Sequence, residues 1–258
     1  MSVKKGTGIG VLKDVKDYWH IRSESYSKQN IAELHSYKRR AWKEIILENA
    51  PKKDRLKILD VGTGPGFFAI NLALEGHDVT AVDCTEQMIE KAKLNAAAYE
   101  ADVDFFVANA HELPFENGKF DLVISRNVVW NLENPRSAFE EWDRILSDKG
   151  RVLYYDANWY LHLFDEDHAK EYTKCQMEAD RLYPSECPSK TIGVHMEKIA
   201  YNLPLSKVQR PRWDVEALEE CGMNVIKVDE NIGDKVWEES EKLRYKATPM
   251  FMVCAGKA

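Results

Sequence analysis

Apolar strand-like runs and amphipathic helix-like runs alternate from residue 56 onward, and this rhythm constrains the fold more than any other feature of the chain. The predicted strands are residues 56–61, 78–82, 103–107, 120–125 and 151–155, with helices at 66–75, 85–99 and 135–146 between them. Units of this length pair in parallel through right-handed crossovers. Two later strands, at 223–228 and 250–255, complete the prediction. It is an α/β fold with a seven-stranded, mostly parallel, Rossmann-like sheet and helices on both faces.

Two segments lie outside this alternation. Residues 1–51 are predicted to form an N-terminal helical cap, in which Asn30 caps a helix with apolar residues at helical spacing. Residues 52–258 are predicted to form the main domain. Within it, the rhythm breaks at 158–212, a stretch interrupted by prolines that we expect to be a helical lid over the substrate. After this insertion, Asp214 is predicted to cap a short helix.

Composition narrows the class of protein. The 258 residues are 44% hydrophobic, which is sufficient for a sizeable core, and carry a formal charge of −7. Scattered lysines and arginines do not form the basic surface that nucleic-acid binding needs, and no apolar run approaches the ~20 residues of a membrane span. Five cysteines without a CxxC pair, and a start without a signal-peptide core, favour a reducing cytoplasm. No metal site is predicted, because no compact ligand motif occurs.

A glycine-rich turn between the first strand and its helix is the main functional signal. The segment 59–66 reads LDVGTGPG, with Asp60 at the strand end and glycines at Gly62, Gly64 and Gly66. Glycines allow a ligand to approach the backbone closely, and the following helix start offers free N–H groups. We expect the carboxylate of Asp60 to meet an ammonium group of a ligand.

A second acid closes the next strand. Asp83 comes seventeen residues after Gly66, where a carboxylate can accept hydrogen bonds from both ribose hydroxyls of a nucleoside cofactor. The NAD fingerprint is GxGxxG, whereas this loop is GxGxG with an acid before it, so NAD is disfavoured. A tight turn without a ligand stays open as the alternative.

Four stretches in order resemble the class I S-adenosylmethionine (SAM)-dependent methyltransferases, in particular their UbiE-like small-molecule branch. They are LDVGTGPG, VDCTEQM, ANAHELPFENGKFDLVISRN and the helix–strand unit around Gly150. The resemblance covers about residues 56–156 and, more weakly, the final strands. It implies a cytoplasmic methyltransferase with SAM as cofactor, S-adenosylhomocysteine as its product and a small-molecule methyl acceptor as partner, with no nucleic acid and no membrane.

The same resemblance implies a set of cofactor contacts. Asp83 would bind the ribose, Met88 would lie near the adenine, and Asn109, which stands where many relatives carry Asp, would flank the adenine with Ala110. An N-terminal segment resembles one that folds over the cofactor in relatives, with Arg22 on the SAM carboxylate. The full predicted cofactor set is Tyr18, Arg22, Tyr26, Asp60, Gly62, Gly64, Gly66, Asp83, Cys84, Met88, Asn109, Ala110, His111 and Asn127.

The acceptor is expected at the ends of the fourth and fifth strands, because ligands of open α/β sheets bind outside the carboxyl ends of strands. Asp156 and Asn127 are the predicted catalytic residues, with Asp156 as a base or a substrate anchor or, alternatively, a capping acid. The predicted substrate-binding residues are Trp130, Asn131, Trp159 and Tyr160. An acidic, aromatic pocket favours an amine acceptor.

The sequence departs from the family pattern in two places, and two other functions remain open. Many relatives carry His after the fourth strand, whereas this chain has Asn127, and it lacks the NPPY-like motif of adenine methylation. An NAD-dependent oxidoreductase and a catalytically silent SAM-binding module remain the alternative functions. The sequence pattern carries no information on the oligomeric state.

Overall fold

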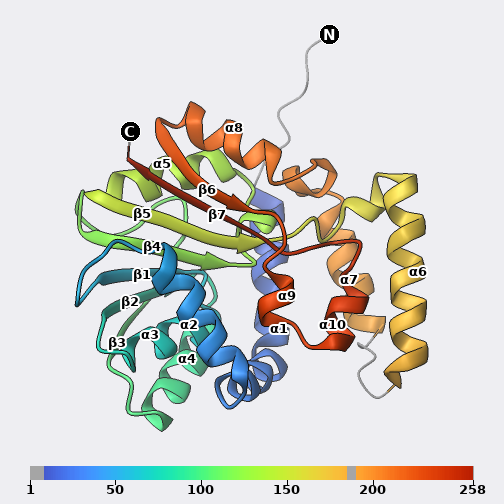
Figure 1. Cartoon of the computed structure of the whole chain (residues 1–258), viewed down its shortest axis with the longest axis horizontal. Coiled ribbons are helices and arrows are strands. Elements are labelled where there is room, and N and C mark those ends of the chain that lie inside the picture. Colours follow the sequence, from blue (N-terminus) through green and yellow to red (C-terminus); the bar gives the residue numbers. More distant parts are fainter. Residues whose placement is uncertain (1–8, 185–189, 258) are drawn as a thin grey trace.

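A seven-stranded sheet forms the centre of the molecule in a computed structural model that describes residues 9–184 and 190–257 (Figure 1). Its order is β3-β2-β1-β4-β5-β7-β6. The strands are β1 Lys57–Val61, β2 Asp78–Asp83, β3 Val103–Val107, β4 Phe120–Arg126, β5 Leu146–Asp156, β6 Met223–Asp229 and β7 Phe251–Lys257. The first five strands pair in parallel, and β7 is antiparallel to both of its neighbours. The predicted α/β fold is therefore confirmed.

Alternating side chains of the strands form two cores, one on each face of the sheet. Ile58 of β1 packs with α2 (Tyr37–Asn49), α3 (Phe67–Ala73) and α4 (Glu86–Ala98). Its neighbour Leu59 packs on the opposite face with α5 (Pro135–Ile145) and α8 (Arg212–Glu220). This arrangement leaves the carboxyl ends of the parallel strands as the edge where loops gather.

The N-terminal segment differs from its prediction. Helix α1 runs from Ile9 to Leu34, so Asn30 lies inside the helix, 2% exposed, and does not cap one. The break comes at Ser36, whose hydroxyl accepts the backbone N–H of Lys38 and begins α2. A side-chain oxygen at the true N-cap decides where the new helix starts.

The fifth strand also begins earlier than predicted. A turn was expected at residues 148–150, but β5 extends from Leu146. Phe120 of β4 pairs with Leu146, and pairing resumes with Leu122 opposite Arg151, so the intervening residues of β5 form a bulge. Gly150 lies in it, where an added Cβ would come within 3.0 Å of the Phe120 carbonyl oxygen.

The insertion predicted at 158–212 holds η2 (Leu161–Leu163), α6 (Glu166–Leu182), α7 (Lys190–Ala200) and η4 (Pro204–Lys207). Helix α6 packs against α10 (Glu239–Arg244) and α7 against α1, so these helices gather at one side of the sheet (Figure 1). Neither α10 nor the short α9 (Gly233–Val236) was predicted. Asp214 lies inside the first turn of α8 and is fully buried, so it is not the predicted cap.

Candidate active site

A cleft of about 740 Å³, counted to its open mouth, lies at the carboxyl ends of β1, β2 and β4. Four segments of the chain line it. They contribute Leu12, Val15, Trp19 and Tyr26 from α1; Val61, Gly62 and Gly64; Val82, Asp83, Cys84, Met88, Ala108, Asn109, Ala110 and His111; and Arg126, Asn127, Val128, Asn131, Leu132 and Glu133. This size and mostly apolar lining are typical of a small-molecule or cofactor site.

The glycine-rich turn has the backbone that its sequence requires. Gly62 and Gly64 adopt φ angles of +69° and +54°, a region that L side chains rarely occupy. An added Cβ on Gly62 would come within 2.3 Å of a methyl group of Val128, and one on Gly64 within 3.4 Å of the Tyr26 ring. A side chain therefore has no room at position 62, and at position 64 the positive φ would strain any residue other than glycine.

Asp83 lies in the cleft and ties the turn to the second strand. Its Oδ2 accepts the Gly64 N–H at 3.0 Å, and its Oδ1 accepts the Thr85 N–H at 2.8 Å. Burial raises the pKa of the carboxyl, and the hydrogen bonds from Thr85 and Gly64 oppose that rise. The carboxylate is thus an oriented acceptor at the cleft wall.

Asp60 lies beneath the turn, outside the main cleft. It is 2% exposed, and its Oδ2 accepts the Thr63 hydroxyl at 2.6 Å and the Ala69 N–H at 3.2 Å. Burial raises its pKa to about 7. Asp60 borders a smaller cavity of about 260 Å³, which shares Tyr26, Gly62 and Arg126 with the cleft. Its first visible role is to hold the turn.

The sequence interpretation missed Arg126, at the end of β4. Its Nη2 donates to Glu33 Oε2 of α1 at 2.9 Å, and its guanidinium lies 4.6 Å from the centre of the Phe67 ring. It lines both cavities. The ion pair joins the N-terminal helix to the sheet at the cleft, and the signal that marks it is a charged residue directly after the apolar run LVIS.

Asn127 follows Arg126 in a strained conformation. Its φ is +59°, its N–H donates to the Tyr155 carbonyl at 2.9 Å, and its Oδ1 is buried without a hydrogen-bond partner. A non-glycine residue in the left-handed region and an unpaired buried acceptor both cost free energy. At a cleft wall, such features are typical of a position selected for a ligand.

The sequence of this chain is similar to those of known proteins. Residues 59–154 match the methyltransferase domain family. The chain is 40% identical over 84 residues to a release factor glutamine methyltransferase of Koribacter versatilis, covering 32% of this chain and 30% of that protein. It is 29% identical over 119 residues to the ubiquinone/menaquinone biosynthesis C-methyltransferase UbiE of Geotalea uraniireducens, covering 44% and 51%. Residues 59–154, which include the glycine-rich turn and Asp83, are thus similar in sequence to a methyltransferase domain.

The likeness to solved structures concerns the fold alone. Geranyl diphosphate C-methyltransferase from Streptomyces coelicolor superposes with a TM-score of 0.60 at 16% identity, covering 90% of this chain and 84% of that one. A putative methyltransferase in complex with the Trm112 activator of Haloferax volcanii gives 0.59 at 16% identity, covering 92% and 96%. The chain spans about a third to a half of the length of the curated relatives that it matches.

Most of the residues that the sequence analysis predicted to contact SAM come together in the cleft. Those that line it are Tyr26, Gly62, Gly64, Asp83, Cys84, Met88, Asn109, Ala110, His111 and Asn127, with the predicted substrate residue Asn131. Asn109 Oδ1 lies 2.7 Å from His111 Nδ1, so these two side chains form a unit at the end predicted for the adenine. Trp19, Val128, Leu132 and Glu133 also line the cleft but were not predicted.

Other predicted residues lie outside the cleft lining. Asp60 and Gly66 lie on the inner side of the turn. Tyr18 of α1 is buried against α7. Arg22 has a buried Nε without a hydrogen-bond partner. The predicted aromatic residues Trp130, Trp159 and Tyr160 pack with Tyr18 beyond the cleft. The strand ends thus bring these rings beside the cleft and not into it.

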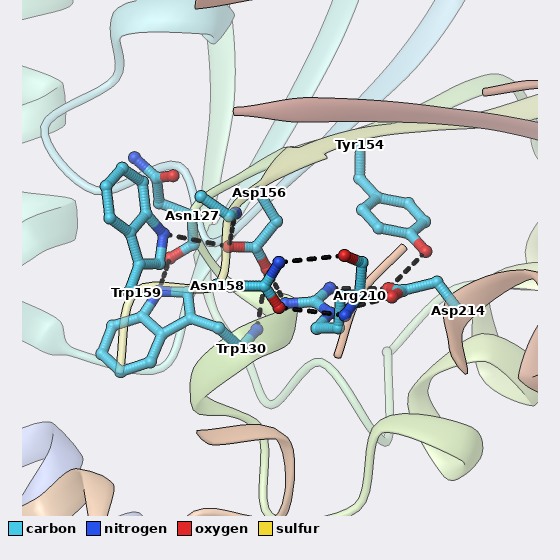
Figure 2. A network of polar contacts seen from close by, with 9 residues as sticks. Asn127, Trp130, Tyr154, Asp156, Asn158, Trp159, Arg210 and Asp214 are labelled. Carbon is cyan, nitrogen blue, oxygen red and sulfur yellow. Dashed lines mark hydrogen bonds and ion pairs between the residues drawn. The ribbon is translucent and has the colours of Figure 1, made fainter. Parts of the chain in front are cut away.

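Asp156 lies in a buried polar network next to the methyltransferase cleft (Figure 2). The side chain is 0% exposed. Its carboxylate accepts hydrogen bonds from Trp130 N (2.8 Å), Ala157 N (2.9 Å), Trp159 Nε1 (3.1 Å) and Arg210 Nη1 (2.8 Å). This burial and these four hydrogen bonds favour the alternative of a capping acid over a base or a substrate anchor. Its function here is to hold the turn that follows Asn127.

Arg210 joins this network to the far end of the insertion. Its Nε and Nη2 bind Asp214, and the Tyr154 hydroxyl donates to Asp214 at 2.8 Å (Figure 2). Asn158 accepts the Arg210 N–H and donates to the Arg210 carbonyl, both at 2.9 Å. Arg210 therefore links the residues that follow β5 to the beginning of α8.

In the part of the chain that the structure describes, no three His, Cys, Asp or Glu side chains are grouped so as to hold a metal ion. Over the same residues, no helix has the length and apolarity needed to cross a membrane.

Proposed function

We propose that this chain transfers the methyl group of SAM to a small-molecule acceptor, and that the accepting atom is an amine nitrogen. The cleft carries the proposal, because one wall combines the Gly62–Gly64 turn, the Asp83 carboxylate and the unpaired Oδ1 of Asn127. When bound, SAM supplies a methyl carbon activated by its sulfonium. The acceptor lone pair forms the new bond, and the electrons of the broken carbon–sulfur bond remain on sulfur.

The residues present fit this cofactor. The glycines let the turn adopt its positive φ angles at the cleft wall, where its bare backbone would face the amino-acid end of SAM. Asp83 offers acceptor oxygens for the ribose hydroxyls. The buried, unpartnered Nε of Arg22 supports its proposed contact with the SAM carboxylate.

Met88 and Ala110 are proposed to flank the adenine, with Cys84 and the Asn109–His111 unit at its edge. Both Met88 and Ala110 are buried, so they form the apolar surfaces that a flat base requires.

The proposed acceptor is small because α1 contributes Leu12, Val15, Trp19 and Tyr26 to the cleft. This helix covers a face that a protein or nucleic acid would have to reach. Catalysis then consists largely of alignment and exclusion of water. The Oδ1 of Asn127 is proposed to accept an N–H of the amine and so direct the nitrogen lone pair.

Methyl-labelled SAM tests this proposal. We expect SAM to bind and label to appear on members of a panel of amines, with less on matched alcohols and thiols. Gly64→Val should abolish SAM binding, because the side chain fills the turn at a positive φ, whereas Gly10→Ala, with open space around it, should leave it intact. Binding of NAD in place of SAM would refute the assignment, and SAM binding without label on any acceptor would favour the silent module.

A further inference from the structure

Two polar atoms in the wall of the cleft lack a hydrogen-bond partner. They belong to His111, which follows β3, and to Glu133, which follows η1 (Val129–Asn131), and both residues line the cleft. His111 Nε2 and Glu133 Oε2 are each buried, and neither atom has a hydrogen-bond partner within the described residues. A buried polar atom without a partner costs free energy, so a pair of them at a cleft wall indicates a missing ligand group.

The hydrogen bonds of Asn109 decide which form the His111 ring takes. Asn109 Oδ1 accepts the backbone N–H of His111 at 3.2 Å, so this atom is the carbonyl oxygen of the amide. The same oxygen lies 2.7 Å from His111 Nδ1, which must therefore carry a hydrogen and donate it. Burial lowers the pKa of His111 and favours the neutral ring, in which Nε2 is an acceptor. The two donors from His111 occupy both lone pairs of Asn109 Oδ1.

Packing between two loops brings Glu133 to the same end of the cleft as His111. Ala110 and Leu132, their neighbours in the chain, belong to one apolar cluster. Trp142 Nε1 of α5 donates to the Ala110 carbonyl at 3.2 Å, so the loop after β3 lies on the helix that begins two residues after Glu133. After burial, which lowers the pKa of His111, the Glu133 carboxylate acts to raise it, in agreement with this placement.

No cation forms an ion pair with Glu133 in the part of the chain that the structure describes. Arg136 and Arg144 of α5 and Arg126 of β4 each pair with another carboxylate. Arg22 of α1 lines neither of the two cavities. The cleft thus presents a carboxylate oxygen and a ring nitrogen at one end, and both of them accept hydrogen bonds.

We propose that Glu133 and His111 recognise the 6-amino group of the adenine of SAM, each accepting one of its two N–H bonds. The inference rests on the proposed function, which puts the edge of the adenine at the Asn109–His111 unit. It adds Glu133 as the residue that distinguishes adenine from other purines. An aromatic amine supplies two donors, and the wall supplies two unpaired acceptors. The methyl acceptor is proposed at Asn127 instead, where another loop residue offers its own oxygen.

S-adenosylhomocysteine and its analogue with unsubstituted purine in place of adenine form the test pair. The analogue keeps the ring system, the ribose and the amino-acid end, and it lacks only the 6-amino group. Isothermal titration of the unaltered protein should give S-adenosylhomocysteine an affinity at least about tenfold above that of the analogue, because loss of the amine leaves both acceptors unpaired. Equal affinities would overturn the inference.

A variant with a matched control assigns this preference to the carboxylate. Glu133→Ala should lower the affinity for S-adenosylhomocysteine about tenfold without weakening the binding of the analogue. Glu112→Ala removes the same charge from the residue next to His111. Glu112 is exposed and does not line the cleft, so both affinities should stay as they are. A full preference for adenine in Glu133→Ala would refute the role of Glu133.

Nitrogen NMR of protein with isotope-labelled histidine tests the ring of His111 separately. The Nε2 resonance of His111, identified by its absence from His111→Gln, should be that of a ring nitrogen without a hydrogen. It should shift on addition of S-adenosylhomocysteine and shift much less with the analogue, because only the amine donates to it. A protonated Nε2 in the free protein at neutral pH, or equal shifts with both compounds, would contradict the proposed hydrogen bond.

The same titrations separate this inference from the proposed function. Thermal melting shows that each variant remains folded, and the comparison of the two compounds on the unaltered protein needs no variant. Equal binding of both compounds removes the recognition of the amine and leaves methyl transfer standing. Binding of neither compound would remove the proposed function itself.

Discussion

At the scale of single residues, Asp83 has the sharpest expected effect on the cofactor. Asp83→Ala removes an oriented carboxylate from the cleft wall and the acceptor of the Gly64 N–H. SAM affinity should fall by about 1–3 kcal/mol, the usual cost of losing hydrogen bonds to a charged group. Calorimetric titration of each variant with SAM measures this affinity. Asp121→Ala, at the opposite end of the sheet beside Lys53, is the control, and unchanged affinity in Asp83→Ala would contradict the ribose assignment.

A second residue-scale prediction concerns Asp60, whose folded pKa of about 7 lies above the ordinary 3.8. The folded state holds this proton more tightly than the unfolded state. The resulting stability is complete below pH 4 and is lost as pH rises through about 7. Between pH 4 and 8, the stability of the wild type relative to Asp60→Asn should therefore fall, by up to about 4 kcal/mol. Urea unfolding of the cofactor-free protein at several pH values measures this, and a constant difference would refute the raised pKa.

Residue roles were predictable from sequence where their partners are close in the chain. Asp60, Thr63 and Gly64 lie within one turn, and the sequence pattern predicted the turn itself. The surroundings of Asp156 were not predictable, because the partners of its carboxylate include Arg210, 54 residues later. A local pattern shows that an acid ends a strand, but it does not show whether that acid faces a cleft or a buried arginine.

At the scale of elements, Arg210 holds the exit of β5, the turn after β4 and the start of α8 together. Arg210→Met leaves Asp156 and Asp214 buried without a cation, which should destabilise the fold by about 3–5 kcal/mol. Arg212→Met is the matched control, because its exposed pair with Glu216 should contribute only about 0–1 kcal/mol. Urea unfolding compares the two, and similar losses would mean that the network does not fasten these elements.

The existence of the strands and of most helices was predictable, and their ends and docking were less so. The apolar run of β4 and the Asn134–Pro135 start of α5 are local signals, and Asn134 does accept the Ser137 N–H. Helix α10 was missed because it is short and defined by a capping box between Glu238 and Glu241. Its packing on α6 includes a hydrogen bond between residues 68 positions apart, which no local periodicity encodes.

At the scale of the whole molecule, we expect the N-terminal helix α1 to respond to ligand binding in the cleft. It lines the cleft and is fixed to the sheet by the Arg126–Glu33 ion pair and by the Ser27–Asn95 hydrogen bond to α4. A ligand held between α1 and the glycine-rich turn stabilises both. S-adenosylhomocysteine at a hundred times its Kd should raise the free energy of unfolding by about 2.7 kcal/mol.

Hydrogen exchange resolves where that stabilisation acts. With S-adenosylhomocysteine, amide exchange should slow in the turn 62–66 and in α1 near Trp19 and Tyr26, since both lie against the cleft. Exchange in β6, at the far edge of the sheet, should follow only the global change. Gly64→Val should show neither effect. Protection confined to 59–111, with α1 unaltered, would mean that the N-terminal helix contributes nothing to cofactor binding. The covered face would then offer no reason to limit the acceptor to a small molecule.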